Sequence, residues 1–117
     1  MRLSQERIDS YAEASGDHNP IHLDPDFARA VGLPSTIAHG LLTLAAAVAP
    51  LERWAAEVAY VSKVTCRFSA PVPSGDVLSG QPEVREADPE QMVVILDARN
   101  GSGELALTRA EVALRRL

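Results

Sequence analysis

The pattern of hydrophobic and polar positions changes its period near residue 60, from a helical repeat to the alternation typical of strands. Before this point, the pattern predicts a helix over residues 5–14, with Ser4 as its N-cap. A longer helix begins at about residue 38 and is apolar nearly all round, which is typical of an element buried on most sides. We expect Pro50 to close or kink this second helix.

The segment between these helices, residues 20–34, contains three prolines and several turn signals. This composition indicates a structured loop rather than a linker. Within it, a short helix is predicted over residues 26–30, and Gly32 ends that helix.

After residue 60, apolar and polar residues alternate in segments separated by turn signals, which predicts an antiparallel sheet. The third segment is apolar on both faces, so we expect it to lie centrally, with the buried helix on one side and another protein surface on the other. The phase of the last segment slips near Arg109, which indicates a bulge. The predicted strands span residues 63–69, 77–85, 92–99 and 105–114. The fold class expected is therefore α+β, with an antiparallel sheet wrapped around a long buried helix.

Length, composition and charge limit the classes of protein to consider. A chain of 117 residues fits one domain, residues 1–117, and a hydrophobic share of 46% argues against global disorder. The net charge is −5 and no basic cluster is longer than Arg115-Arg116, so a nucleic-acid partner is not expected.

The compartment and the cofactors follow from what the sequence lacks. Cys66 is the single cysteine and cannot form an internal disulfide, which fits a reducing cytoplasm. The N-terminus has no signal-peptide core, and the longest weakly polar run, residues 37–51, is too short to span a bilayer. We therefore expect a cytoplasmic protein without a membrane partner. Because no zinc-binding spacing is present, we expect neither a metal nor a cofactor.

Candidate chemistry is concentrated in two short stretches before the apolar helix. Residues 15–24 read SGDHNPIHLD, and residues 37–40 read IAHG. Together they hold two carboxylates, an amide and three histidines, which are poor material for packing against an apolar helix. A chemical role is the economical explanation.

These stretches resemble the hydratase motif of the MaoC-like dehydratases and (R)-specific enoyl-thioester hydratases. The later RFSAPVPSGD, residues 67–76, is also similar to that family's turn into its next strand. The resemblance covers about residues 4–116 and implies the hotdog fold. Only residues 1–3 precede the first helix, where family members usually have a strand and a loop, so we expect a truncated first strand.

The resemblance implies a role for each matching residue. Asp17 and His22 form the expected catalytic dyad, because histidine exchanges protons near neutral pH and a carboxylate fixes its partner by accepting a hydrogen bond. Gly40 begins the buried helix and is expected to donate its N–H to an oxyanion. Asn19 and His39 complete the oxyanion and substrate-binding set, and we expect them to orient the loop rather than to react.

Two neighbouring polar residues are expected to have no chemical role. Asp24 should hydrogen-bond the loop to the start of the buried helix, together with His39. His18 occupies a position that the family pattern leaves free, so we expect it to face solvent.

The activity implied is reversible hydration of a trans-2-enoyl thioester to the (R)-3-hydroxyacyl thioester, on coenzyme A or acyl carrier protein. Two alternatives stay open: a hotdog acyl-CoA thioesterase, and a non-catalytic acyl-binding subunit of a heterodimeric dehydratase. Because hotdog proteins generally pair through their sheets, a homodimer is expected, and a heterodimer is the other possibility. Trp54 and Tyr60 are weak candidates for the border of an acyl tunnel.

Overall fold

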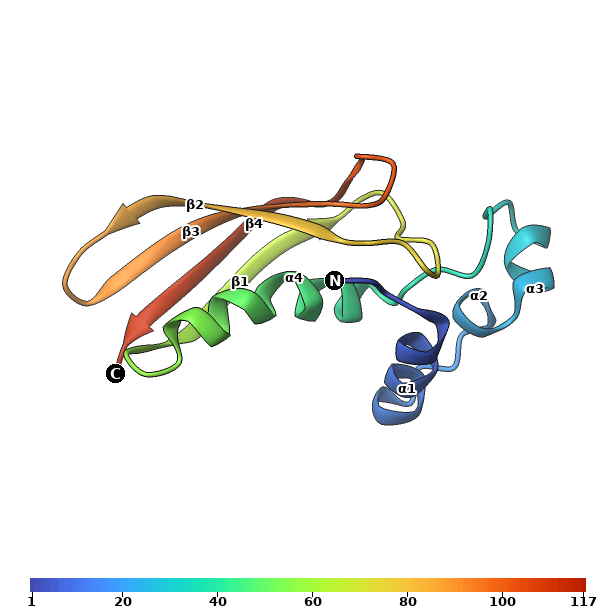
Figure 1. Ribbon diagram of the computed structural model, residues 1–117, viewed down its shortest axis with the longest axis horizontal. Helices are drawn as coiled ribbons and strands as arrows, with labels where there is room; N and C mark the ends of the chain where they lie inside the picture. Colours follow the sequence, from blue (N-terminus) through green and yellow to red (C-terminus); the bar gives the residue numbers. More distant parts are fainter.

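The computed structural model describes residues 1–117 and contains four helices followed by four strands (Figure 1). The elements are α1 (Gln5–Ser15), α2 (Pro20–Leu23), α3 (Pro25–Ala30), α4 (Gly40–Ala55), β1 (Ala59–Phe68), β2 (Ser79–Ala87), β3 (Gln91–Arg99) and β4 (Leu105–Arg116). No helix has the length and apolar content that crossing a membrane requires.

The strands form one antiparallel sheet in the order β1-β4-β3-β2. Helix α4 lies along one face of this sheet, and α1, α2 and α3 gather beyond one end of it (Figure 1). Strand β3 is flanked by β4 and β2, so its expected central position is confirmed. This architecture confirms the α+β class expected from the sequence.

The core lies between α4 and the sheet. The buried side of α4 includes Val48 and Leu51, and the sheet contributes Val94, Leu96 and Val112, all under 8% exposed. The expectation that α4 is buried on most sides is only partly correct. Two of its large apolar residues are uncovered, Leu41 at its start and Trp54 near its end, which are 61% and 67% exposed.

Pro50 does not end α4, since the helix continues to Ala55. Proline lacks an N–H and therefore removes one hydrogen bond inside the helix. Beyond Pro50, however, Leu51 and Ala55 are buried in the core, and their packing outweighs the missing bond.

The residues that precede α1 pair with the segment just before β2. Arg2 forms an isolated antiparallel bridge with Val77, and Leu3 exchanges backbone hydrogen bonds with Gly75 and Asp76. Because Val77 pairs with Arg2, strand β2 begins at Ser79 and not at the predicted residue 77. These contacts connect the start of the chain to the segment just before β2.

The bulge predicted in the last strand is also confirmed. Arg109 has a φ of 53°, and the registers of both neighbours of β4 shift beside it. The extra residue lets β4 keep Leu107 and Ala110 buried on either side of the irregularity.

Candidate active site

The loop that carries Asp17 is fixed by a series of local caps. Helix α1 ends at Gly16, whose φ of 79° is the left-handed conformation that glycine adopts without strain. Asp17 then accepts a hydrogen bond from the N–H of Asn19 through Oδ1 at 3.2 Å, and Asn19 Oδ1 in turn accepts from the N–H of Ile21 at 3.1 Å. The Asn19 side chain is therefore the N-cap of α2.

Helix α2 corrects the expectation of a loop between residues 20 and 25. The sequence contained a signal for it, because Asn19 is a good N-cap and Pro20 occupies the first helical position, where its missing N–H costs nothing. This single turn matters because it carries His22 and directs that side chain inward.

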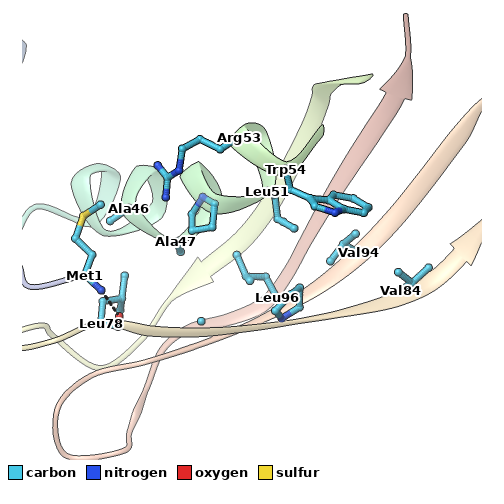
Figure 2. A pocket seen from close by; sticks show the side chains of 13 residues that line it. Met1, Ala46, Ala47, Leu51, Arg53, Trp54, Leu78, Val84, Val94 and Leu96 are labelled. Carbon is cyan, nitrogen blue, oxygen red and sulfur yellow. Dashed lines mark hydrogen bonds between the residues drawn. The ribbon is translucent and has the colours of Figure 1, made fainter. Parts of the chain in front are cut away.

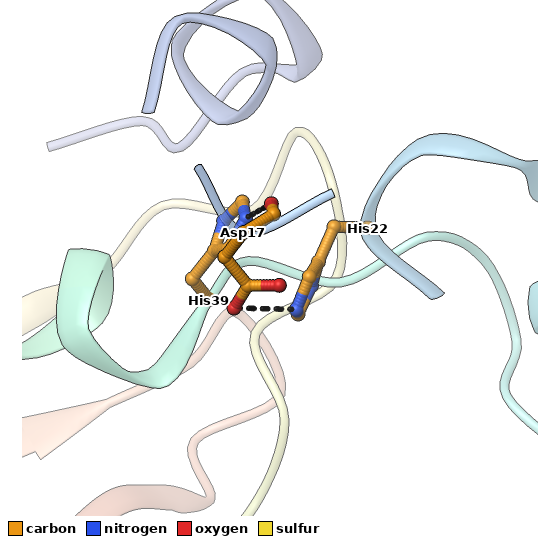
Figure 3. Close-up of side chains that lie close together, drawn as sticks. All are labelled: Asp17, His22 and His39. Atoms are coloured by element: carbon orange, nitrogen blue, oxygen red, sulfur yellow. Dashed lines mark hydrogen bonds and ion pairs between the residues drawn. The ribbon is translucent and has the colours of Figure 1, made fainter. Parts of the chain in front are cut away.

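His22 is buried and held by two hydrogen bonds. Its Nδ1 lies 2.8 Å from the carbonyl oxygen of Ile37, and its own carbonyl accepts from Gln5 Nε2 at 2.8 Å. A carbonyl only accepts, so Nδ1 carries the proton and Nε2 of the neutral ring is an acceptor. That Nε2 faces Asp17 Oδ2 at 4.0 Å (Figure 3).

His39 contacts both members of this pair. Its ring stacks on that of His22, with centroids 3.8 Å apart and planes 26° apart, and Tyr11 packs on its other side at 4.8 Å. Its Nε2 donates to the backbone carbonyl of Asp17 at 3.0 Å, which leaves Nδ1 buried without a partner. His39 thus ties the loop of Asp17 to the start of α4, as the sequence suggested.

Gly40 is the first residue of α4, and its N–H makes no hydrogen bond within the chain. The residue is exposed, and it lines one cavity with His22 and another with Asp17. A side chain at this position would meet the ring of Phe68, whose nearest carbon atoms lie 3.2 Å from an ideal Cβ. Both Asp17 and His39 line a cavity that Gly40 also lines.

Of the two polar residues expected to have no chemical role, Asp24 makes other contacts than expected and His18 lies as expected. Asp24 accepts hydrogen bonds from the N–H groups of Asp26 and Phe27, so it caps α3 and does not tie the loop to α4, which corrects that expectation. His18 is exposed as expected. A hydrogen bond to Glu13 raises the pKa of His18, and the carbonyl of Gly16 adds to this effect.

The structure brings Asp17, His22, His39 and Gly40 together but places Trp54 elsewhere. Trp54 lines a separate apolar groove of about 610 Å³ between α4 and the β2–β3 side of the sheet (Figure 2). None of the four residues above lines that groove, and Tyr60 does not line it either.

Sequence reasoning missed two supporting residues. Thr36 Oγ1 donates to Gln5 Oε1 at 2.7 Å, so a chain of hydrogen bonds runs from Thr36 through Gln5 to the backbone of His22. Gln5 and Thr36 are 31 positions apart, and no local pattern connects them. The tertiary fold alone creates this contact.

Asp17, His22 and His39 offer potential ligand atoms within 4.8 Å of one another, which raises the question of a metal ion. The two imidazoles are stacked, so their lone pairs run side by side rather than toward one point. His39 Nε2 is also engaged with a backbone carbonyl. This geometry suits proton transfer between His22 and a bound water better than coordination of a cation.

Comparisons with known proteins agree with this description. The MaoC like domain family matches residues 1–102. The chain is 38% identical over 91 residues to the 3-hydroxybutyryl-CoA dehydratase of Methylorubrum extorquens, covering 76% of this chain and 57% of that protein. It is 42% identical over 73 residues to the 3-hydroxyacyl-thioester dehydratase X of Mycobacterium tuberculosis, and this match covers 62% of this chain and 25% of that protein.

The solved structure of the unliganded R-hydratase PhaJ1 from Pseudomonas aeruginosa matches with a TM-score of 0.90 and 27% identity, covering 99% of this chain and 76% of that one. The matched part of the chain covers about a quarter of the length of the Mycobacterium relative and somewhat over half of the length of the Methylorubrum relative. The sheet and central helix are therefore the hotdog fold that the sequence motifs implied.

Proposed function

Since the chain belongs to the MaoC like domain family, we propose that it is a hydro-lyase that reversibly hydrates a trans-2-enoyl thioester to the (R)-3-hydroxyacyl thioester. The observation that carries this proposal is the geometry of the dyad. Asp17 Oδ2 and His22 Nε2 face each other at 4.0 Å, next to the free N–H of Gly40.

The separation of 4.0 Å is too long for a direct hydrogen bond and suits a water molecule that contacts both groups. His22 Nε2 can take a proton from this water because its Nδ1 already holds one. The carboxylate of Asp17 accepts a hydrogen bond from the hydrogen that stays on the water oxygen, and so orients that oxygen toward C3 of the substrate.

The remaining steps complete the addition. The water oxygen bonds to C3, and the electrons of the C2–C3 double bond move toward the thioester carbonyl. The N–H of Gly40 stabilises the charge on that carbonyl oxygen at the positive end of α4. The proton held by His22 then passes to C2, so one molecule of water has been added in total.

The test follows the absorbance of crotonyl-CoA at its enoyl band. We expect the wild-type protein to reduce it, and Asp17→Asn and His22→Ala each to lose roughly two to four orders of magnitude in rate. His18→Gln is the matched control, because His18 lies beside Asp17 in sequence but its ring contacts Glu13 and the carbonyl of Gly16 rather than His22. Unaltered rates in both dyad variants exclude the assignment.

The two alternative functions, a thioesterase and a non-catalytic subunit, are each recognised by a different assay. A thioesterase releases free coenzyme A from acyl-CoA, which a thiol reagent detects. A non-catalytic subunit binds enoyl-CoA but turns it over only when a second chain is added. The intact pair of Asp17 and His22 supports the hydratase over both.

The cellular setting proposed is a cytoplasmic homodimer that acts on a thioester of coenzyme A or acyl carrier protein. Support for the compartment is limited to the single unpaired Cys66. Support for the dimer comes from the exposed apolar residues of α4. The identity of the carrier is decided by comparing the rate on crotonyl-CoA with that on the crotonyl carrier protein.

A further inference from the structure

Each member of the proposed dyad lines a cavity that the other does not line. One, of about 250 Å³, is lined by His22 and by apolar residues of the loops around it. The other, of about 430 Å³, is lined by Asp17 and His39. Only Gly40 and Phe68 line both cavities. A substrate that contacts Asp17 and His22 at once therefore has to sit against these two residues.

Phe68 is placed there by the end of β1. Phe68 is 54% exposed, although its side chain is large and apolar. The ring packs against the α-carbon of Gly40, and its Cδ1 and Cε1 atoms lie 3.2 Å from the site of a missing Cβ. The aromatic ring thus lies against the residue whose backbone N–H is proposed as the oxyanion donor.

The chemistry of the substrate decides what this ring meets. A carbonyl oxygen bound to the Gly40 N–H places its carbonyl carbon about one bond further out, and the sulfur of a thioester is bonded to that same carbon. Sulfur is polarisable and makes favourable contacts with aromatic rings, at about 5 Å from the ring. The oxygen of an ordinary ester does not gain this contact.

We propose that Phe68 is a specificity-determining residue that recognises the thioester sulfur and thereby favours thioesters over oxygen esters. The inference rests on the proposed function, because it uses the Gly40 N–H as the oxyanion donor. It adds a preference within that function that neither the dyad nor Gly40 provides.

The experiment compares crotonyl-CoA with its analogue in which oxygen replaces the thioester sulfur. The intrinsic reactivities of the two compounds differ, but this difference cancels when the ratio of their kcat/KM values is compared between proteins. For Phe68→Leu, we expect the preference for the thioester to fall about three- to tenfold. Phe68→Tyr keeps the ring and should retain the wild-type ratio.

Tyr60→Leu is the matched control, since Tyr60 is also an exposed aromatic residue of β1 but lines neither cavity. It should leave the ratio unchanged. If Phe68→Leu lowers kcat/KM equally for both compounds, the proposal is overturned, because a merely structural role would affect both compounds alike. Thermal melting identifies any variant that fails to fold.

A second measurement separates this inference from the proposed function. Equilibrium binding of the unreactive butyryl-CoA and of its oxygen analogue is measured by calorimetry for the wild type and for Phe68→Leu. A thioester preference that falls in the variant supports the sulfur contact even without turnover. A wild type that binds both compounds equally refutes it. Absence of hydration by a wild type with this preference refutes the hydratase assignment alone.

Discussion

Gly40 meets two requirements that a larger residue cannot meet together. Its N–H has to stay open to a substrate, and its α-carbon has to fit under the ring of Phe68. Its backbone is helical, so the left-handed freedom of glycine is not what the position needs. The absence of a side chain is what matters here.

Gly40→Ala is therefore expected to separate activity from stability. The added methyl group lies 3.2 Å from the Phe68 ring and narrows the approach to the N–H, so we expect kcat/KM on crotonyl-CoA to fall at least tenfold. Alanine lowers the entropy of the unfolded chain, which offsets the tight contact, so the free energy of unfolding should change by less than about 1 kcal/mol. A fall in activity that only follows a loss of folded protein would contradict this.

His18 provides a pH-dependent contact beside the dyad. The hydrogen bond to Glu13 raises the pKa of His18 in the folded state, so this contact stabilises the fold at pH values below the ordinary histidine pKa. The contribution is lost as pH rises through the raised value. Both side chains are exposed, so the effect on stability is small.

Glu13→Gln should therefore lower the pKa of His18 toward its ordinary value, and an NMR titration of the imidazole measures it. The pH profile of hydration should stay as in the wild type, because the His18 ring contacts Glu13 and Gly16 rather than Asp17 or His22. A parallel shift of both the titration and the rate profile would place His18 in the reaction.

The position of α2 depends on a contact between elements rather than on its own sequence. Four residues are too few for a stable isolated helix, yet this turn carries His22. The side chain of Gln5 in α1 connects the His22 carbonyl to the hydroxyl of Thr36. The geometry of the proposed dyad is thus set by three segments at once.

Gln5→Leu keeps a similar volume and removes the hydrogen bonds to the His22 carbonyl and the Thr36 hydroxyl, as well as an exposed one to Asp9. It leaves a part-buried carbonyl and hydroxyl unpaired, so we expect a loss of about 1–3 kcal/mol in the free energy of unfolding. Activity should fall as well, through kcat more than KM, because His22 shifts relative to Asp17. Gln5→Glu retains one acceptor for Thr36, so its free energy of unfolding should lie between those of the wild type and of Gln5→Leu. Denaturant unfolding and steady-state kinetics measure both effects.

The elements that the sequence predicted correctly are those with a local signal. The apolar run in β3, the phase slip at Arg109 and the cap at Ser4 are each visible in the sequence within a few residues. The role of Gln5 and the exposed apolar residues of α4 arise from long-range packing, which no local pattern encodes. Asp24 was expected to contact the start of α4, but it caps α3, which follows it directly in the chain.

At the scale of the whole molecule, the uncovered apolar surface is not where the sequence suggested. The outward face of β3 carries Ile95, which is only 37% exposed, and an ion pair between Arg85 and Glu111 lies beside it. Larger apolar side chains remain exposed on α4 and on β1, which is an edge strand of the sheet. A second copy is better accommodated on the α4–β1 side than on the outer face of β3.

A homodimer through this side predicts a particle of twice 12.5 kDa in light scattering coupled to size exclusion. Leu41→Glu places a charge at the exposed start of α4 and should reduce the mass to that of one chain, because an unpaired charge in an interface is costly to desolvate. Asp26→Lys, on exposed α3, is the control and should leave the mass unchanged. A wild type of one-chain mass excludes the homodimer, and a Leu41→Glu variant of two-chain mass moves the interface away from α4.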